Sequence, residues 1–495
     1  MSLAIVHSRA QVGVGAPPVM VEAHLANGLP ALTLVGLPEA SVKESKDRVR
    51  SAIINSGLNF PARRITLNLA PADLPKDGGR FDLAIALGIL AGSGQIPGDA
   101  LQMVECLGEL ALSGAVRTVQ GVLPAALAAR DAGRTLIVPL ENAEEAALAN
   151  GLSVIAVGHL LELVGHLNGQ TPISPFRANG LLYKPRPYPD LAEVQGQLAA
   201  KRALLVAAAG AHNLLFSGPP GTGKTLLASR LPGLLPPLTE PEALEVAAIQ
   251  SVASHAPLKH WPQRPFRHPH HSASGAALVG GGSRPQPGEI TLAHHGVLFL
   301  DELPEFDRKV LEVLREPLES GEIVIARARD KLRFPARFQL VAAMNPCPCG
   351  YLGDSTGRCR CSTEQIDRYR NKLSGPLLDR IDLHVTVARE STTLNPTLDG
   401  ETTASVAERV ADTRGRQQQR QGCANAFLDL PGLRTHCRLA LADEQWLETA
   451  CERLTLSLRA AHRLLKVART LADLDGAANI AREHVAEALQ YRPAT

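Results

Sequence analysis

The segment LLFSGPPGTGKT, residues 214–225, joins a short apolar run to a glycine-rich loop that ends in lysine and threonine. Backbone N–H groups beside glycines can approach phosphate oxygens, the lysine can reach the β- and γ-phosphates, and the hydroxyl can coordinate Mg²⁺. We therefore expect a site for ATP and Mg²⁺. The residues expected to form it are Gly218, Pro219, Pro220, Gly221, Thr222, Gly223, Lys224 and Thr225.

Polar residues also follow two apolar runs further along the chain. VLFLDE places Asp301 and Glu302 after four apolar residues, and QLVAAMNP places Asn345 at the end of another run. Parallel sheets bind ligands at the carboxyl ends of their strands. We expect Asp301 to hold Mg²⁺ through its water shell, and Glu302 to polarise the attacking water. Asn345 suits a water-orienting role, although Asn-Pro also starts ordinary turns.

These residues resemble the AAA+ ATPases, and within them the magnesium chelatase-like branch that includes the minichromosome maintenance helicases. The resemblance implies that the glycine-rich loop is Walker A, that Asp301 and Glu302 form Walker B, and that Asn345 is sensor 1. The central segment is thus expected to be a P-loop α/β domain.

Two arginines acquire roles from the same resemblance. Arg380, in SGPLLDRIDLH, corresponds to an arginine finger donated to a neighbouring subunit, and Arg459 to the sensor 2 arginine, with Arg463 as the fallback. Because a finger stabilises charge on the transferred phosphoryl group, hydrolysis would depend on assembly. A surface salt bridge is the alternative for either arginine.

Two segments have the positions of insertions found in that branch. Residues 266–296 are rich in glycine and proline, are too long for an ordinary connection, and resemble the helix-2 insertion. This segment contains His268, His270 and His271, whose spacing is more typical of loop or packing residues than of a metal site.

The other segment, EIVIARARDKLRFPARFQLV, predicts a basic β-hairpin and resembles the pre-sensor 1 hairpin. Its cationic residues are expected to bind single-stranded and branched DNA through the phosphates, independently of sequence. A solvated edge hairpin protected by charge is the alternative. The residues concerned are Arg327, Arg329, Lys331 and Arg333.

Four cysteines form two C-x-C pairs across a short glycine-containing loop, in NPCPCGYLGDSTGRCRCS. Four thiolates this close suit a structural, tetrahedral Zn²⁺, and free thiols or a redox-sensitive pair are the alternatives. The proposed ligands are Cys347, Cys349, Cys359 and Cys361. The other four cysteines are isolated and typical of packing residues.

Composition says little about partners, because the 495 residues carry a formal net charge of only +2. The first residues lack a signal sequence, and the longest apolar run, residues 83–91, is too short to span a bilayer. We therefore expect a cytoplasmic protein that does not enter a membrane.

Alternating strand and helix patterns indicate an α/β fold with four parts. They are an α/β domain at 1–170, a proline-rich linker at 171–189, the AAA+ domain with the C-x-C pairs at 190–390, and a helical lid at 391–495. The first part resembles the Lon protease domain. Arg80 and Ala125 stand where that family has its nucleophile and its lysine, so we expect no protease activity.

The order of these parts resembles the bacterial ComM/YifB family over nearly the whole chain. The resemblance implies a homohexameric, ATP-driven DNA helicase that promotes branch migration and aids integration of incoming DNA during natural transformation, with recombination proteins as possible partners. The alternative is a magnesium chelatase-like remodelling ATPase that acts on a protein partner.

Overall fold

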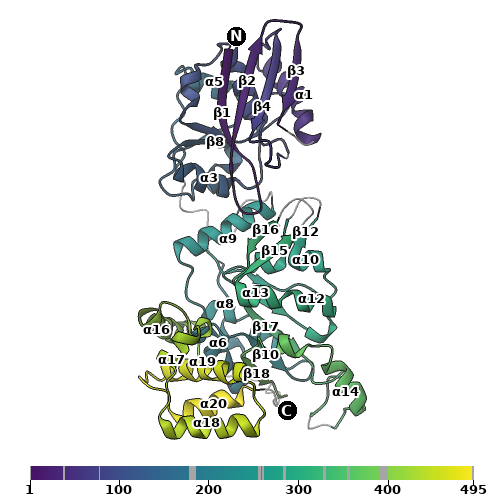
Figure 1. Cartoon of the computed structure of the whole chain (residues 1–495), viewed down its shortest axis with the longest axis vertical. Helices are drawn as coiled ribbons and strands as arrows, with labels where there is room; N and C mark the ends of the chain where they lie inside the picture. The colour runs from purple at the N-terminus through teal and green to yellow at the C-terminus, as the bar shows by residue number, and fades with distance from the viewer. Residues whose placement is uncertain are drawn as a thin grey trace. The chain divides into compact units, whose positions relative to one another are not determined.

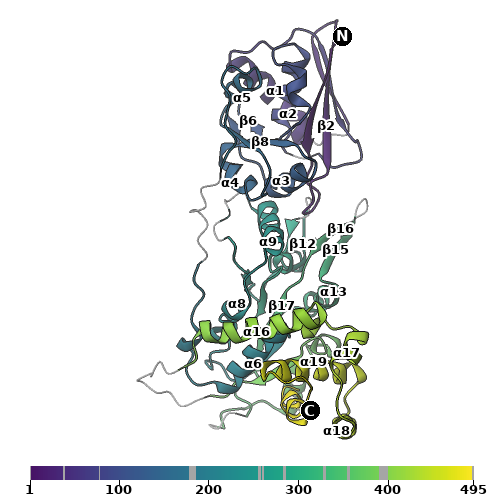
Figure 2. The same cartoon turned by 90° about the vertical axis from the view of Figure 1, so that its left-hand side faces the viewer.

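The computed structural model describes residues 2–36, 40–76, 78–177, 186–254, 258, 261–282, 286–326, 331–353, 357–389 and 400–492. Its contacts define two compact units, both drawn in Figure 1 and Figure 2. Unit 1 comprises Met1–Pro185, Ala243–Pro262 and Pro285–Pro287, and unit 2 comprises Arg186–Glu242, Gln263–Arg284 and Gly288–Thr495. Within the described residues, no helix is both long and apolar enough to cross a membrane.

Unit 1 is built on a mixed seven-stranded sheet with the order β3-β4-β2-β1-β5-β8-β9. Burial alternates along β2 and β4, so one face of each strand enters the core. β2 pairs antiparallel with β1 and β4, and the remaining neighbours are parallel. The strands are β1 Ser2–Arg9, β2 Pro18–Ala26, β3 Ala31–Val35, β4 Arg64–Ala70, β5 Val104–Cys106, β8 Thr135–Pro139 and β9 Val154–Val157.

Helices of unit 1 cover both faces of this sheet, because α1, α2 and α5 share a core with Ile137 of β8, whereas α3 and α4 share another with Leu136 and Val138. The central one, α2 (Asp82–Gly92), is apolar on all sides and almost completely buried, as expected for a helix surrounded by its neighbours. The others are α1 Ala40–Asn55, α3 Val122–Asp131, α4 Ala143–Ala146 and α5 Leu160–Leu167, and a short hairpin is formed by β6 Glu109–Leu110 and β7 Val116–Arg117.

Helix α9 (Glu240–Ala253) returns to unit 1 from a later part of the sequence. Ala247 and Ala248 share a small apolar core with Leu123 of α3. Ser251 accepts the backbone N–H of Gly121 at its carbonyl and that of Leu123 at its hydroxyl. The sequence-based boundaries placed residues 243–262 in the segment 190–390, whereas contacts group the described residues of this range with unit 1.

Unit 2 contains a five-stranded sheet with the order β11-β14-β17-β10-β18, parallel throughout. The strands are β11 Phe266–Arg267, β14 Val297–Leu300, β17 Gln339–Met344, β10 Leu214–Ser217 and β18 Leu383–Thr386. All residues of β14 and β17 are buried, which explains their continuous apolar runs. A parallel sheet with polar residues after its strands is the arrangement expected of a nucleotide-binding domain.

Short helices and a hairpin surround this sheet. Hairpin strands β15 (Glu322–Ala326) and β16 (Lys331–Pro335) are antiparallel, so the predicted hairpin is confirmed. The helices are α6 Leu198–Gly210, α7 Lys224–Ala228, α8 Leu231–Leu234, α10 Gly275–Val279, α11 Glu289–Leu292, α12 Arg308–Val313, α13 Arg315–Ser320, α14 Thr363–Arg370 and α15 Gly375–Leu378, and short strands occur at β12 Gly280–Gly281 and β13 Gln286–Pro287.

The C-terminal region is helical and shares a core with one face of the sheet. Leu464, Val467 and Leu471 of α19 pack in the same cluster as residues of α6 and β10. A polar run at 413–421 forms the end of α16, and Gly422 caps this helix with a φ of +72°. The helices are α16 Thr403–Gln421, α17 Leu430–His436, α18 Leu441–Arg453, α19 Leu458–Leu474 and α20 Arg482–Gln490. The predicted α/β fold with a helical C-terminal region is confirmed.

Candidate nucleotide site and cysteine cluster

The glycine-rich loop connects β10 to α7, where the sequence predicted it. Gly221 and Gly223 have φ of +78° and +83°, a backbone conformation that other residues rarely adopt. A Cβ on Gly218 would lie 2.2 Å from the carbonyl oxygen of Val387, just beyond β18. The loop therefore needs glycine at these positions for its backbone path as well as for phosphate approach.

Lys224 lies buried at the start of α7. Its Nζ donates to the carbonyl oxygens of Gly218 at 2.7 Å and Pro219 at 2.8 Å, and to Oδ1 of Asn345 at 3.2 Å. Burial lowers the pKa of Lys224, and the charge of Asp301 opposes this effect. Since its hydrogen-bond partners are neutral, the ammonium charge remains available to phosphate oxygens.

Thr225 and Asp301 meet at the next position. Thr225 Oγ1 donates to Asp301 Oδ2 at 2.6 Å, which joins a hydroxyl and a carboxylate of the kind that hold Mg²⁺ in phosphate sites. Glu302 follows with a φ of +52°, and its N–H donates to Asp301 Oδ1 at 2.9 Å. A left-handed backbone is uncommon for a glutamate.

His271 contacts Glu302, a relationship the sequence did not reveal. Its Nδ1 lies 3.1 Å from Glu302 Oε2, and its ring stands edge-on to Phe306. His268 packs against the Phe299 ring, whereas His270 bonds to the hydroxyl of Ser272 and lies against the His271 ring, with ring centroids 4.1 Å apart. No spacing rule relates residues 271 and 302, because only the folded sheet brings them together.

Arg380 lies in an ion pair within its own chain. Its Nη2 lies 2.5 Å from Glu319 Oε1, and Nη1 donates to the carbonyl oxygen of Pro376. Arg463, the fallback for sensor 2, has Nη2 3.1 Å from Oδ1 of Asp379, the residue before Arg380. In this structure Arg380 therefore makes an intrachain salt bridge, which was the alternative to the arginine-finger role.

Arg459 lies one helical turn before Arg463, exposed on the first turn of α19. Both arginines line a cleft of about 530 Å³, together with Leu430, Leu433 and Lys466. The ion pair to Asp379 brings Arg463, rather than Arg459, next to Arg380.

Hairpin β15–β16 has one apolar and one polar face. Ile323 pairs with Phe334 and both are buried, whereas Arg333 is 75% exposed at its side chain and lies 3.7 Å from Glu322. Lys331 is also exposed. Arg327 and Arg329 lie outside the described residues.

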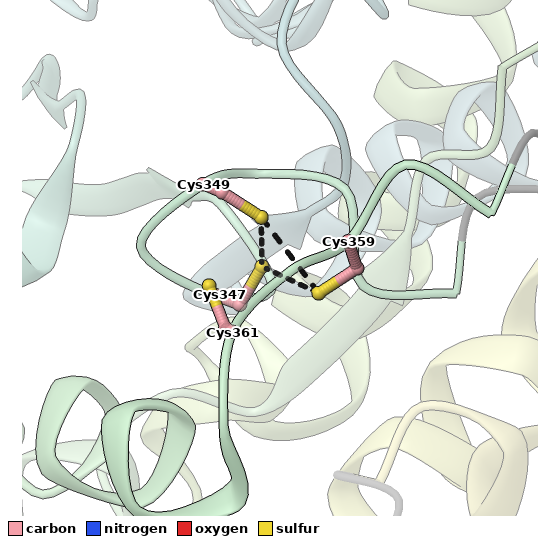
Figure 3. A group of neighbouring side chains, drawn as sticks. All are labelled: Cys347, Cys349, Cys359 and Cys361. Atoms are coloured by element: carbon pink, nitrogen blue, oxygen red, sulfur yellow. Dashed lines mark hydrogen bonds between the residues drawn. The ribbon is translucent and has the colours of Figure 1, made fainter.

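The four clustered cysteines converge on one point, as Figure 3 shows. Cys347 Sγ lies 3.4 Å from Cys349 Sγ and 3.8 Å from Cys359 Sγ, and the latter two are 3.7 Å apart. With Cys361, all four Sγ atoms lie within 4.8 Å of one another. A tetrahedral zinc with Zn–S bonds of about 2.3 Å requires sulfurs about 3.8 Å apart, whereas a disulfide requires about 2.05 Å. The cluster fits a metal better than a disulfide.

Hydrogen bonds favour the thiolate form at one cysteine of this cluster. The backbones of Tyr351 and Arg360 hydrogen-bond to Cys349 and lower the pKa of its thiol to about 6, so that the metal-binding thiolate is favoured there at neutral pH. At Cys361 a backbone hydrogen bond with Cys349 acts in the same direction, but side-chain hydrogen bonds and burial outweigh it and raise the pKa to about 11.

The two positions that argued against protease activity are both buried in unit 1. Arg80 Nη1 donates to Oε1 of Gln11, and burial lowers the pKa of this guanidinium to about 10. Ala125 is buried in α3. A buried arginine and an alanine supply neither a nucleophile nor a base there.

Comparisons with known proteins agree with this geometry. Three family models match: subunit ChlI of magnesium chelatase over residues 21–142, the magnesium chelatase subunit ChlI model over 190–394, and its C-terminal model over 400–492. The competence protein ComM of Haemophilus influenzae is 54% identical, over 99% of this chain and 98% of its own length. YifB of Escherichia coli is 53% identical, over 99% and 97%. The magnesium-chelatase 38 kDa subunit of Rhodobacter capsulatus is 27% identical, over 61% of this chain and 86% of that subunit.

Proposed function

Because this chain belongs to the ComM/YifB family of magnesium chelatase-like AAA+ ATPases, we propose that it is an ATP-driven DNA helicase that promotes branch migration. Its proposed task is the integration of incoming DNA during natural transformation or homologous recombination, together with recombination proteins. The similarity to a protein named for competence supports this setting. The convergence of Lys224, Thr225, Asp301 and Asn345 at one edge of a parallel sheet is the observation that carries the ATPase part.

We propose the following roles at the nucleotide site. Lys224 binds the β- and γ-phosphates, Thr225 and Asp301 hold Mg²⁺, and Glu302 accepts a proton from the attacking water. Mg²⁺, when bound, neutralises charge on the phosphates. Asn345 orients the water, and its contact with Lys224 supports this assignment because it places the amide beside the phosphate-binding lysine.

We infer that hydrolysis depends on subunit assembly because of two arginine roles. We propose a homohexamer in which Arg380 leaves Glu319 and reaches the phosphates bound by a neighbouring copy, with Arg459 or Arg463 as the sensor 2 residue. Leaving a buried carboxylate without its partner would cost free energy. The side chain of Glu319 is 55% exposed, however, so water can solvate it when Arg380 moves away. Hydrolysis would then require neighbouring subunits.

DNA contact is assigned to the β15–β16 hairpin. We propose that Lys331 and Arg333, with Arg327 and Arg329 beyond the described residues, bind backbone phosphates of single-stranded or branched DNA. The exposure of the Arg333 side chain supports this role, since only an accessible cation can exchange its counterions for phosphate contacts.

The four-cysteine cluster is proposed to hold a structural Zn²⁺. Four sulfur ligands fill a tetrahedral coordination sphere and leave no position for a reacting water. The sulfur–sulfur spacings of Cys347, Cys349 and Cys359 support this assignment.

A branch-migration assay tests the proposed function. The purified protein should show ATPase activity that DNA stimulates, and it should displace a strand from a branched substrate in the presence of ATP. Lys224→Ala is the control, because it should do neither. Absence of both DNA binding and DNA stimulation in an active ATPase would overturn the helicase proposal.

The alternative is a remodelling ATPase that acts on a protein partner. The similarity to the 38 kDa subunit of magnesium chelatase favours it, since that likeness covers 61% of this chain. ATP-dependent capture of a partner by Glu302→Gln, together with an ATPase that DNA does not stimulate, would support this alternative.

A further inference from the structure

The residues that follow β17 belong to two sites at once. Asn345 accepts a hydrogen bond from Lys224 Nζ at 3.2 Å, and Cys347, only two residues later, is a fully buried member of the cysteine cluster. A displacement of Cys347 would therefore be transmitted to Asn345 through a single intervening residue.

Gly350 brings the same turn against the phosphate loop. Its N–H donates to the carbonyl oxygen of Cys347 at 2.9 Å, and its φ is +84°. A Cβ built at this position would lie 2.8 Å from Cδ of Pro220 and 3.8 Å from Cγ of Asn345. The cysteine turn and the phosphate loop are thus in contact at a point where no side chain fits.

The other cysteine pair connects to the same place through α14. Ser362, directly after Cys361, caps α14 through a reciprocal pair of hydrogen bonds with Gln365. Further along this helix, Tyr369 is buried and hydrogen-bonds to the backbone of Asn345. Both ends of the cysteine loop therefore lead to Asn345.

The same helical segment also reaches the loop that follows Glu302. Lys372 Nζ lies 3.3 Å from Oε2 of Glu305, three residues after the proposed water-activating carboxylate. This pair is half-exposed and weak by itself, but it shows where the segment lies.

We propose that the four cysteines, by closing around a zinc ion, position Asn345 and the phosphate loop for ATP hydrolysis. In this role, which we call a brace, the zinc-bound cluster holds Asn345 and the phosphate loop in position and does not contact DNA. This inference rests on the zinc site and the ATPase assigned under the proposed function. Cys347, Gly350 and Tyr369 become positioning residues, since none of them needs to touch the nucleotide.

The expected effect follows from how sharply catalysis depends on geometry. Asn345 must keep its amide within hydrogen-bond distance of the water that it orients, and misplacement of a catalytic group by 1 Å can cost about 100-fold in rate. Binding of ATP depends mainly on Lys224 and the backbone of the phosphate loop, so it should be affected less.

Two glycines in the same loop provide a matched test. Gly350 and Gly353 both have left-handed backbones, with φ of +84° and +79°, so alanine strains both alike. Among the described residues, nothing lies within 4 Å of a Cβ at Gly353, whereas Gly350 faces Pro220. Gly350→Ala should keep its zinc and lower the maximal hydrolysis rate by at least about 10-fold, and Gly353→Ala should resemble the wild type.

A second test removes the metal. Cys359→Ser should lose zinc, measured by elemental analysis, and should lose most of its hydrolysis while a fluorescent ATP analogue still binds within about 3-fold of wild-type affinity. Cys451→Ser, which changes a half-buried cysteine outside the cluster, is the control. Should Cys359→Ser fail to fold, zinc can be stripped from the wild type with a mercurial and a chelator and then restored.

The outcomes separate this inference from the proposed function. Equal hydrolysis rates in Gly350→Ala and Gly353→Ala, or full hydrolysis by zinc-free protein, would overturn the brace. Both rates are measured without DNA, so a failure of the helicase assay would leave these results interpretable. Absence of zinc from the wild-type protein, with normal hydrolysis, would also overturn it.

Discussion

Nδ1 of His271 lies 3.1 Å from Oε2 of Glu302. This contact joins the glycine- and proline-rich segment after β11 to the carboxylate proposed to activate water at the end of β14. A partner at this distance fixes where the carboxylate points, and so whether it faces the water or turns away from it.

Substitution of His271 tests this link. His271→Ala should lower the maximal rate of ATP hydrolysis by about 10-fold without weakening ATP binding, because Glu302 loses the group that orients it. Phosphate release at saturating ATP measures the rate. His268→Ala is the matched control, since His268 is exposed and packs against the Phe299 ring instead of a carboxylate. Equal rates in the two variants would contradict the orienting role.

Substitutions of Lys224 and Glu302 should affect ATP binding and ATP hydrolysis separately. Lys224→Ala should abolish ATP binding, because it removes the cation that meets the phosphates. Glu302→Gln should bind ATP normally and lose at least about 100-fold in hydrolysis, since an amide cannot accept the proton of the attacking water. Titration with a fluorescent ATP analogue, followed by a phosphate-release assay, measures both. A Glu302→Gln protein with wild-type turnover would exclude Glu302 as the base.

Arg380 and its partner Glu319 offer a paired experiment. Arg380→Ala should leave ATP binding intact and reduce hydrolysis by about 1,000-fold if the side chain acts as a finger. Glu319→Gln removes the 2.5 Å ion pair but keeps the arginine, so hydrolysis should persist. Rates are compared at protein concentrations where the wild type is assembled, as judged by light scattering. Similar losses in both variants would indicate that the intrachain pair, rather than a finger, is what matters.

Salt dependence tests the hairpin. Lys331→Ala and Arg333→Ala should each weaken binding to single-stranded DNA and reduce the slope of log affinity against log salt by about 0.7, the value for one lost phosphate contact. Fluorescence anisotropy of a labelled oligonucleotide over a range of salt concentrations gives that slope.

Glu322→Gln serves as the control for the hairpin, because it frees Arg333 from a carboxylate 3.7 Å away without removing a cation. Its DNA affinity should equal or exceed that of the wild type. Unchanged slopes in both alanine variants would instead support the solvated-hairpin alternative.

Local motifs could be located from sequence because each lies within one strand and one loop. The run from Leu214 to Thr225 determines its own strand, turn and helix start, and four apolar residues before Asp301 suffice for a buried parallel strand. The cysteine spacing likewise indicated convergence before any fold was known.

Contacts between distant segments could not be anticipated in the same way. Glu319 and Arg380 are 61 residues apart, and His271 reaches Glu302 only because β11 and β14 are neighbours in the sheet. From sequence Gly350 is an ordinary turn glycine, and only the structure shows that it lies against Pro220. The apolar residues of helix α9 likewise do not reveal from sequence which core they enter.

That helix has a consequence for how the chain folds during synthesis. The ribosome makes α3 more than a hundred residues before α9, and until then Leu123 lacks the packing of Ala247 and Ala248, and the N–H of Gly121 lacks the carbonyl of Ser251. The N-terminal unit therefore cannot complete itself when residue 170 emerges, and a nascent chain would carry an exposed apolar patch until about residue 262 has left the tunnel. Protection of the small core around Leu123 from proteolysis should therefore begin only at that length.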